Sequence, residues 1–432
     1  MPTEDAPAME RVAIVGMGRV GLPLAIAFAE AGLRVLGIEA DPTRRATLEL
    51  GKMPFLAPGA DEPLLAAVNA GRFTVHEDAA EAVPQADAVV LTVATPLSVD
   101  LRADYGQIHR ALDQIAPHLR PGQLLVLRST VAPGTLTKIV LPHLRALLPD
   151  VVDELLLASC PERIAEGRQI AELRELPEIV GGIDDASTRA AAGLFARLNP
   201  EKRIHLTDPV SAELAKLFTN VYRYVNFALA NEFAVLGEYY RVDAHRIIDL
   251  VNADYPRANI PKAGPAGGPC LSKDGYFLVE ELTLPDFVLI AGKLNDTIPA
   301  YLVRRLARRL DDHGLGLAGT PVAVLGKTFK RDSDDLRQSP AVRIVDTLVR
   351  EGADVRVHDP FLNGLTLDAA LDGAQAFVLA TNHTAYDALR PEDVAGLMST
   401  PRLGLDCWGV LDRERFGAAG IELVTFGVGE EL

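Results

Sequence analysis

The segment Gly264–Asp274 has the residue types of a catalytic loop. Three glycines and two prolines precede Cys270, and Lys273 and Asp274 follow it. Glycine lets the backbone approach a ligand closely, and proline restricts the loop to few conformations. This pattern indicates a rigid loop that presents a cysteine sulfur, with a carboxylate near enough to take part in proton transfer. Spacing alone leaves a second interpretation open, a buried cysteine beside a surface turn.

The N-terminal segment has the pattern of a dinucleotide-binding turn. An apolar strand runs into Gly16-x-Gly18-x-x-Gly21, and a helix and a second strand ending at Glu39 follow. In this context the glycines permit a tight turn, close approach of a pyrophosphate and packing of the helix on the strand. The helix N-terminus offers N–H groups to the phosphates. Glu39 suits two ribose hydroxyls and favours NAD, whereas the nearby cation Arg44 keeps NADP open.

Further strands are expected at 88–93, 124–127 and 154–158, with helical segments between them. This alternation predicts a parallel sheet covered on both faces. Ligands of such sheets bind at the carboxyl ends of the strands. Thr95 and Thr130 follow two of the strands and are therefore candidate contacts for the nicotinamide half. Each is also typical of an ordinary turn.

A long helix is expected over residues 208–236, because aspartate and proline begin it and no glycine or proline interrupts it. Lys216, Asn220 and Arg223 recur at i, i+4 and i+7, which places them in one stripe. A neighbouring stripe that includes Phe218 is expected to be apolar core. The polar stripe indicates a polar pocket, with a solvent-exposed face as the alternative. A helix of this length is also typical of a dimer interface.

A second strand–loop–helix–strand unit is expected over 321–358. Its first loop, 326–340, lacks the glycine pattern and carries cations instead. These cations are Lys327, Lys330, Arg331 and Arg337. Side-chain cations suit a phosphate that is held without glycine backbone. We therefore expect one dinucleotide and one further nucleotide-like ligand.

Length and composition limit the remaining possibilities. With 432 residues the chain is too long for one core, and we expect an NAD-binding domain (1–205), a central helical domain (206–312) and a C-terminal domain (313–432). Three widely spaced cysteines argue against a disulfide framework, and the histidines have no metal-ligand spacing, so no metal is expected. A net charge of −16 disfavours nucleic acid as a partner. Without an export signal or an apolar run of about 20 residues, a cytoplasmic protein with no membrane segment is expected.

Together these motifs resemble the nucleotide-sugar 6-dehydrogenase family, which includes UDP-glucose and UDP-N-acetylmannosamine dehydrogenases. The likeness extends from Val12 to about Arg413. It is carried by Gly16–Gly21, Ser129–Gly134, Pro161–Gly167, Ala212–Leu217, Gly267–Asp274, Phe329-Lys330 and Asp335–Arg337. It implies an α/β fold with two Rossmann-like, doubly wound domains joined by a long central helix. Pro161-Glu-Arg, together with Arg223 and Val225-Asn226, is more similar to the N-acetylhexosamine branch, so UDP-N-acetylmannosamine is the first choice of substrate.

The resemblance implies oxidation of the C6 hydroxyl of a UDP-sugar to the uronate, with NAD as cofactor and a thiohemiacetal and a thioester on Cys270. Lys216 would take acid–base and oxyanion roles, and Asn220 would help to hold the oxyanion. Asp274 and Glu162 would assist the attacking water. The expected UDP-sugar contacts are Arg163, Ile164, Arg223, Arg257, Gly267, Phe329 and Lys330. The expected NAD contacts are Gly16, Gly18, Val20, Gly21, Glu39, Arg44, Thr95, Thr130, Glu166, Lys273 and Arg337.

The family pattern also implies a homodimer through the central helix, with Arg257 reaching the substrate of a second subunit. Some positions differ from that pattern. Arg128 occupies a position where glutamate or lysine is common, and Asp406-Cys-Trp-Gly409 lacks an arginine. UDP-glucose and other UDP-hexosamines are alternative substrates. A hydroxy-acid dehydrogenase and a non-catalytic nucleotide sensor are alternatives from other functional classes.

Overall fold

The first sheet of the protein has eight strands and is parallel except at one position. In the computed structural model, which describes residues 9–429, the strand order is β3-β2-β1-β4-β5-β6-β7-β8. The strands are β1 (Arg11–Val15), β2 (Arg34–Ile38), β3 (Phe73–His76), β4 (Ala88–Leu91), β5 (Leu124–Leu127), β6 (Leu156–Ser159), β7 (Glu178–Gly182) and β8 (Ile204–Thr207). The pair β6 and β7 is antiparallel, which the alternating pattern did not predict. The strand order reverses between β1 and β4, and ligands of such sheets bind beside the carboxyl ends of the strands at this point.

Helices cover both faces of this sheet, because successive strand residues point to opposite sides. Val12 and Ile14 of β1 belong to one core, and Ala13 and Val15 belong to the other. The first core takes residues from α1 (Gly21–Glu30), α2 (Pro42–Glu49), α3 (Asp61–Asn69), α7 (Gln169–Glu175) and α8 (Asp185–Ala196). The second takes residues from α4 (Ala79–Ala82), α5 (Gly106–Ile115) and α6 (Leu141–Leu147). The expected parallel arrangement with two covered faces is therefore present.

The second sheet has five parallel strands in the order β10-β9-β11-β12-β13. Its strands are β9 (Pro321–Leu325), β10 (Asp354–His358), β11 (Ala376–Leu379), β12 (Leu403–Asp406) and β13 (Glu422–Thr425). One face packs against α12 (Asp286–Asp312), α13 (Pro340–Arg350) and part of α9 (Pro209–Tyr239). The other packs against α14 (Leu367–Leu371), α15 (Pro391–Leu397) and α16 (Arg413–Ala418). The expected fold class, two Rossmann-like α/β domains with a long central helix, is confirmed.

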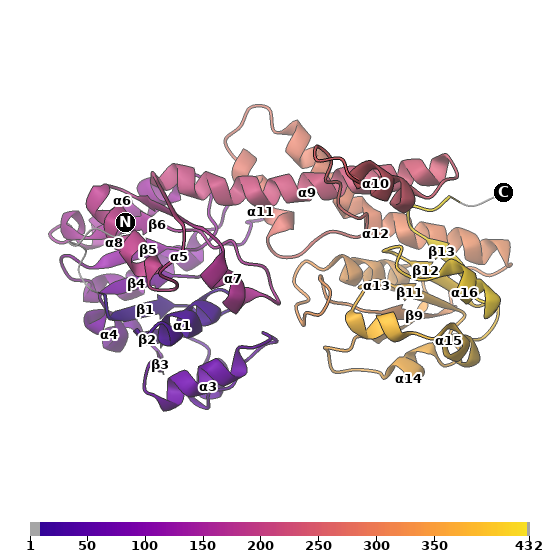
Figure 1. Cartoon of the computed structure of the whole chain (residues 1–432), viewed down its shortest axis with the longest axis horizontal. Helices are drawn as coiled ribbons and strands as arrows, with labels where there is room; N and C mark the ends of the chain where they lie inside the picture. The colour runs from indigo at the N-terminus through magenta and orange to yellow at the C-terminus, as the bar shows by residue number, and fades with distance from the viewer. Residues whose placement is uncertain (1–8, 430–432) are drawn as a thin grey trace. The chain divides into compact units, whose positions relative to one another are not determined.

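The long helix α9 has 31 residues and is prominent in Figure 1. Asp208 begins it as expected, because its carboxylate accepts the N–H of Ser211 at 2.9 Å. Part of the predicted apolar stripe is wrong, since Phe218 is 58% exposed whereas Leu217 is fully buried. The remaining helices are α10 (Ala244–Asn252) and α11 (Leu271–Val279).

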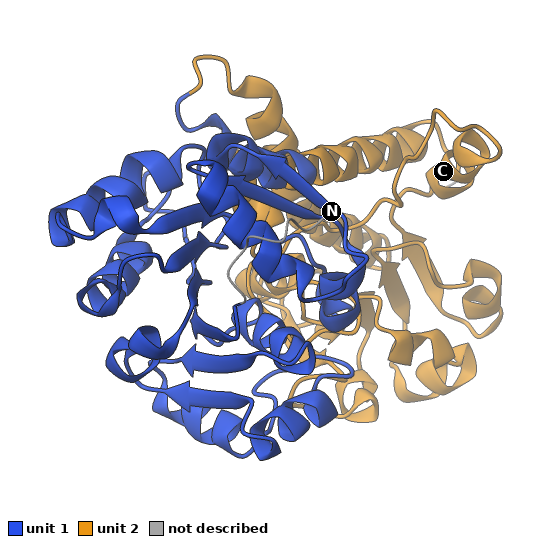
Figure 2. Cartoon of the chain, turned by 60° about the vertical axis from the view of Figure 1, so that its left-hand side comes forward, with its two compact units in different colours: residues 1–219, 276–281 blue, residues 220–275, 282–432 orange. Residues whose placement is uncertain are grey.

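The chain divides into two units, coloured separately in Figure 2. The first contains residues 1–219 and 276–281, and the second contains residues 220–275 and 282–432. Both α9 and α11 contribute residues to each unit. The three-domain division at 205 and 312 stays a prediction. Within residues 9–429, none of the helices is long and apolar enough to cross a membrane.

Candidate active site

The turn after β1 is closed by contacts within its own backbone. A Cβ at Gly21 would overlap the carbonyl oxygen of Gly16, so this position requires glycine. The hydroxyl of Thr92 donates to the same carbonyl at 2.8 Å and holds it in place. Apart from Gly18 itself and its two chain neighbours, none of the described residues has an atom within 4 Å of a Cβ built at Gly18. The side of the turn at Gly18 is therefore open to a pyrophosphate, as the glycine pattern predicts.

The carboxylate at the end of β2 suits an unphosphorylated ribose. Glu39 is buried and accepts the backbone N–H groups of Met17 at 3.2 Å and Asp41 at 3.0 Å. Arg44 is the cation that left NADP possible as the cofactor, and it forms an ion pair with Glu39 at 3.0 Å. Helix α1 begins after Val20 without a side-chain cap. The N–H of Leu22 donates to the carbonyl of Gly18 at 3.0 Å, so the N–H of Gly21 is the candidate contact for a phosphate. These residues fit NAD.

The loops after β4 and β5 meet at the two predicted threonines. Thr95 is buried, and its hydroxyl donates to the backbone carbonyl of Thr130. Glu166, in the loop after β6, forms an ion pair with Arg19 of the glycine turn at 3.4 Å. The structure thus brings one predicted cofactor residue from each of three loops to the carboxyl ends of the strands of the first sheet.

A buried arginine organises the same edge of the sheet, and sequence reasoning did not assign it a role. Arg128 is 1% exposed and pairs with Glu162 at 2.6 Å and Glu178 at 3.0 Å. Although burial acts to raise the pKa of Glu162, the charge of Arg128 and the N–H of Ile164 lower it below its usual value. Burial raises the pKa of Glu178, and Arg128 opposes part of that increase. The signal in the sequence was an arginine directly after an apolar strand.

The first half of α9 carries two buried ionisable residues. Lys216 is buried, and its charge also lowers the pKa of Glu162. Glu213, one turn earlier, accepts the backbone N–H groups of Gly134 at 2.6 Å and Leu136 at 3.0 Å. Burial raises the pKa of Glu213 to about 7. The buried position of Lys216 agrees with a polar pocket rather than with a solvent-exposed face.

The second unit places Cys270 one helical turn before a held carboxylate. The carbonyl oxygen of Cys270 accepts the N–H of Asp274 at 3.0 Å, so the cysteine is at the N-terminus of α11. Its side chain is exposed, which excludes the alternative of a buried cysteine. Asp274 is fully buried, and it accepts the amide Nδ2 of Asn220 at 2.6 Å and pairs with the Nζ of Lys273 at 3.0 Å. Asn220, Lys273 and Asp274 therefore form one hydrogen-bonded group.

The glycines before Cys270 are needed because other side chains fill the space beside them. A Cβ at Gly268 would lie 2.5 Å from the ring of Phe329, and φ there is +98°. A Cβ at Gly267 would lie 2.6 Å from Pro340. At Gly264 a Cβ would overlap the indole of Trp408. The loop of Cys270 is thus packed against the 326–340 loop of the second sheet, which carries Phe329.

Two buried asparagines anchor this loop from behind, and the sequence offered no signal for them. Gly264 donates its N–H to the amide oxygen of Asn231 at 2.9 Å. Asn231 donates to Asn295 at 3.0 Å, and Asn295 donates to the carbonyl of Tyr224 at 3.0 Å. This chain of amides connects the loop to α9 and α12.

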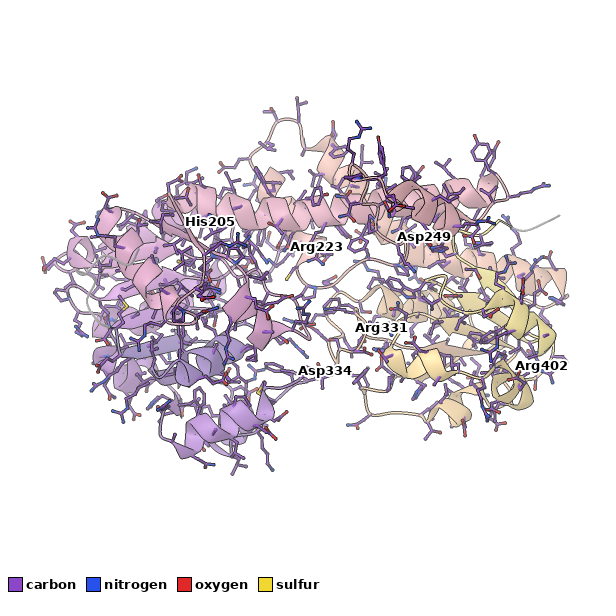
Figure 3. All side chains as sticks on the ribbon, in the orientation of Figure 1. His205, Arg223, Asp249, Arg331, Asp334 and Arg402 are labelled. Carbon is purple, nitrogen blue, oxygen red and sulfur yellow. The ribbon has the colours of Figure 1, made fainter. Side chains whose placement is uncertain are left out.

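The cations of the 326–340 loop have different environments. Arg337 pairs with Asp335 at 2.7 Å and has a half-exposed side chain. Lys330 is partly buried beside Phe329 in the sequence. Arg331 pairs with Asp387 at 2.5 Å, and Figure 3 labels it on this loop. Arg331 and Arg337 thus each have an acidic partner, and the assignment of the loop's cations to a phosphate stays a prediction.

The predicted substrate residues outside this loop lie at separate places. Arg163 and Ile164 are partly buried, and Arg163 donates to the carbonyl of Pro177. Arg223 is exposed on α9 (Figure 3). Arg257 is exposed, and its guanidinium lies 4.8 Å from the centre of the Tyr255 ring. The polar stripe of α9 is thus divided, with Lys216 and Asn220 buried and Arg223 on the surface.

Comparison with known proteins shows how the whole chain is classified. Three segments match the UDP-glucose/GDP-mannose dehydrogenase family: the NAD binding domain over residues 10–199, the central domain over 210–290 and the UDP binding domain over 323–413. The chain belongs to this family. It is 32% identical to a UDP-N-acetyl-D-mannosamine dehydrogenase of Methanocaldococcus jannaschii over 98% of this chain and 97% of that protein.

Solved structures agree with this dehydrogenase family. A UDP-D-ManNAc dehydrogenase from Pyrococcus horikoshii matches with a TM-score of 0.91 and 30% identity, over 97% of this chain and 99% of that one. A UDP-glucose dehydrogenase from Pyrobaculum islandicum matches with a TM-score of 0.87 and 26% identity, over 99% and 100%. The protein is an NAD-dependent UDP-sugar dehydrogenase, and the relatives support its N-acetylhexosamine branch.

Proposed function

We propose that this dehydrogenase oxidises the C6 hydroxyl of UDP-N-acetylmannosamine to the carboxylate through a covalent intermediate on Cys270. The names of the relatives support this sugar, as does the sequence Pro161-Glu-Arg. The observation that carries the covalent route is the position of Cys270. Its exposed side chain stands at the N-terminus of α11, one turn before the buried Asp274.

The chemistry removes four electrons from C6. One R–CH₂OH, two NAD⁺ and one water become one R–COO⁻, two NADH and three protons. NAD, when bound, accepts the hydride in both oxidations. The thiolate of Cys270 adds to the C6 aldehyde to form a thiohemiacetal, and the second oxidation converts this adduct to a thioester. Water then adds to the thioester carbonyl, and the thiolate leaves as the carboxylate forms.

The residues of α9 and α11 have distinct roles in these steps. Lys216 takes the proton of the C6 hydroxyl and then stabilises the oxyanion. Asn220 has two amide N–H bonds, of which one goes to Asp274 and the other is assigned to the oxyanion. Asp274 assists the attacking water. The first turn of α11 favours negative charge on the sulfur of Cys270, both during addition and when it leaves.

The ligand-binding roles follow the parts of the fold that carry each residue. For NAD we assign the glycine turn with Gly16, Gly18, Val20 and Gly21, together with Glu39, Arg44, Thr95, Thr130, Glu166, Lys273 and Arg337. For the UDP-sugar we assign Arg163, Ile164, Arg223, Arg257, Gly267, Phe329 and Lys330. The close approach of Gly268 to the ring of Phe329 supports the UDP-sugar assignments, because it packs the loop of Cys270 against the 326–340 loop.

A homodimer through α9 accounts for the apolar surface of the second unit. Tyr222, Leu229 and Leu236 recur every seven residues along α9 and are 64%, 46% and 42% exposed. A stripe of this spacing lies on one face of a helix and is typical of a packed interface. In such a dimer, the exposed Arg257 is assigned to the substrate of the second subunit. Light scattering of the purified protein tests this, and a monomer that turns over normally would disprove it.

The experiment that tests the reaction follows NADH formation with a panel of UDP-sugars. We expect UDP-N-acetylmannosamine to give the highest kcat/KM and two NADH for each sugar consumed. Cys270→Ser should stop at the aldehyde level and form at most one NADH per sugar. Two NADH per sugar at the normal rate in Cys270→Ser would contradict the covalent route. A higher kcat/KM with UDP-glucose would contradict the choice of sugar while leaving the route intact.

A further inference from the structure

We infer that the buried amides of Asn231 and Asn295 position the nucleophile, and that this decides whether the C6 aldehyde is captured or released. The inference rests on the proposed covalent route through Cys270. Asn231 lies on α9 and Asn295 on α12, and both belong to the second unit, as Cys270 does. The two asparagines are 0% and 1% exposed, so they act on substrate only through the chain that they hold.

The groups at the two ends of this amide chain fix its direction. The N–H of Gly264 can only donate, and it bonds to Oδ1 of Asn231 at 2.9 Å. The carbonyl of Tyr224 can only accept, and it takes a hydrogen bond from Nδ2 of Asn295 at 3.0 Å. The middle bond therefore runs from Nδ2 of Asn231 to Oδ1 of Asn295, at 3.0 Å. An apolar side chain at either position interrupts this chain, and at Asn231 it also removes the acceptor of Gly264.

The amides supply something that an apolar core cannot. Transfer of an amide to the protein interior costs free energy unless its hydrogen bonds are made. Leucine at both positions would hold α9 against α12 without that cost, but it would leave the buried N–H of Gly264 without its acceptor. The backbone of Gly264 also packs closely on the indole of Trp408, because a Cβ at this glycine would overlap it. An amide oxygen and an indole thus fix the loop at Gly264 together.

The loop before the nucleophile is held at three points that lie four residues apart. The carbonyl and the N–H of Ile260 bond to the side-chain amide of Asn252 at 2.8 and 2.9 Å. Gly264 is held by the amide chain, and Gly268 donates its N–H to the carbonyl of Gln338 at 3.0 Å. The amide that holds the middle point is fully buried, whereas Asn252 is partly buried. The core of the second unit therefore sets the course of the loop at Gly264.

A proline follows each of these three points and makes the loop stiff. The prolines are Pro261, Pro265 and Pro269. Each has a fixed φ and restricts the residue before it. The two glycines between Pro265 and Pro269 pack closely on the 326–340 loop. A displacement at Gly264 is therefore passed on to Cys270 and is not absorbed by the residues between them.

The consequence concerns the step between the two oxidations. The first oxidation converts R–CH₂OH and NAD⁺ to R–CHO, NADH and a proton, and it does not use the sulfur. Addition of the Cys270 thiolate to the aldehyde carbon requires the reacting atoms to meet at about 3–3.5 Å, and a misplacement of about 1 Å can slow such a step about 100-fold. A displaced sulfur therefore slows capture and spares the first oxidation. The aldehyde then leaves the enzyme with two of the four electrons still to be removed.

The test measures aldehyde release by Asn231→Leu in the full-length enzyme, with the UDP-sugar that the unaltered enzyme turns over best. We expect the NADH formed per sugar consumed to fall from two toward one. The free aldehyde, converted to its semicarbazone after quenching, should appear by mass spectrometry. Loss of folded enzyme alone would lower the rate and leave the ratio at two.

Asn199→Leu is the matched control in the first unit. Its amide also ties a turn, through the carbonyl of Arg174 at 3.2 Å and the N–H of Glu201 at 3.0 Å. Asn199 is partly buried and has no assigned role in the reaction. We expect this variant to keep the ratio of two NADH per sugar, whatever its stability.

Two further variants separate positioning from folding. In Asn231→Leu/Asn295→Leu neither amide is left without its partner, so the melting temperature should recover relative to Asn231→Leu while the ratio stays low. Asn231→Asp keeps an acceptor for Gly264 and, when protonated, a donor for Asn295, so its ratio should return toward two as pH falls.

The outcomes are distinct for the inference and for the reaction on which it rests. If Asn231→Leu does not fold, the double leucine variant decides. A ratio of two in every leucine variant that folds, at whatever rate, would overturn the inference. Full two-NADH turnover by Cys270→Ser would overturn the covalent route instead.

Discussion

The first loops of the two sheets, which are assigned to the phosphates of the two ligands, are shaped by different physical means. The loop after β1 is short and glycine-rich, and its own backbone closes it, because a Cβ at Gly21 would overlap the carbonyl oxygen of Gly16. The loop after β9 is long, and side chains hold its shape. Asp359 accepts the N–H groups of Lys327 at 2.7 Å and Thr328 at 3.2 Å, and the buried His383 contacts Asp359 at 3.1 Å.

This difference predicts that the loop after β1 tolerates fewer residue types than the loop after β9. Where backbone N–H groups contact the phosphate, the positions beside it must lack a side chain. The spacing of glycines in the sequence shows this requirement directly. Where a side chain such as Lys330 is the ligand, its position depends on residues that are distant in the sequence. Asp359 and His383 follow Lys330 by 29 and 53 residues. The two loops should therefore respond differently to substitution.

The largest effect is expected for Gly21→Ala in the glycine turn. The new Cβ would overlap the carbonyl oxygen of Gly16, so the turn must open and the first N–H groups of α1 move. We expect NAD affinity to fall at least 100-fold and the first unit to lose about 1–3 kcal/mol of stability. Titration of NADH fluorescence measures the affinity, and calorimetric binding of UDP serves as the control because UDP is assigned to the second unit. Normal NADH binding would contradict the backbone mechanism.

An intermediate effect is expected for Lys330→Met in the side-chain loop. Loss of one charged hydrogen-bonding group costs about 1.5–3 kcal/mol of binding, or roughly a 10- to 150-fold weaker UDP affinity. Arg331→Met is the matched control, because it removes the neighbouring positive charge of the same loop from a residue that is not assigned to the UDP-sugar. UDP affinity should be nearly unchanged in the control, and NADH affinity in both. Equal losses of UDP affinity in the two variants would mean that UDP binding depends on the net charge of the loop and not on the position of Lys330.

The same contrast separates what the sequence predicts from what it does not. The strands β1, β2, β5 and β9, the glycine turn and the Cys270 loop are local patterns, and the structure contains them. The antiparallel pair of β6 and β7 has no local signal, because strand direction depends on how the chain returns to the sheet. The network of Arg128, Glu162 and Glu178 spans 50 residues from first to last. Each member alone is typical of a surface residue, and only the fold brings them together.

The position of Phe218 shows a further limit of periodicity. Helical spacing placed it with the buried Leu217 and Val221, yet its side chain is 58% exposed. Periodicity identifies which residues share a face of a helix, but it does not say whether this chain or a second subunit covers that face. The amides of Asn231 and Asn295 were missed for a related reason. A polar residue within a helical segment can lie on the surface or in the core. Which of the two it does depends on whether the fold supplies a hydrogen-bond partner, and the sequence does not show this.

The smallest effect concerns two buried carboxylates, one in each unit, that both accept backbone N–H groups. Burial raises the pKa of Glu213 to about 7 despite its N–H partners. Burial also acts to raise the pKa of Asp359, but His383 and the N–H groups of Lys327 and Phe361 lower it below its usual value. The two groups therefore make opposite contributions to the pH dependence of stability.

The sign of each contribution follows from the direction of its pKa shift. Glu213 stabilises the fold fully below its unfolded pKa of about 4.3, and this contribution is lost as pH rises through about 7. Asp359 stabilises the fold above its unfolded pKa of about 3.9, and this contribution is lost as pH falls through its lower folded pKa. Glu213→Gln should therefore flatten the fall in melting temperature between about pH 4 and 7. Asp359→Asn should lower the melting temperature at neutral pH by a few degrees and have less effect in acid. Melting temperatures of both variants, measured over this pH range, test the contrast. The same pH dependence of the change in melting temperature in both variants would contradict it.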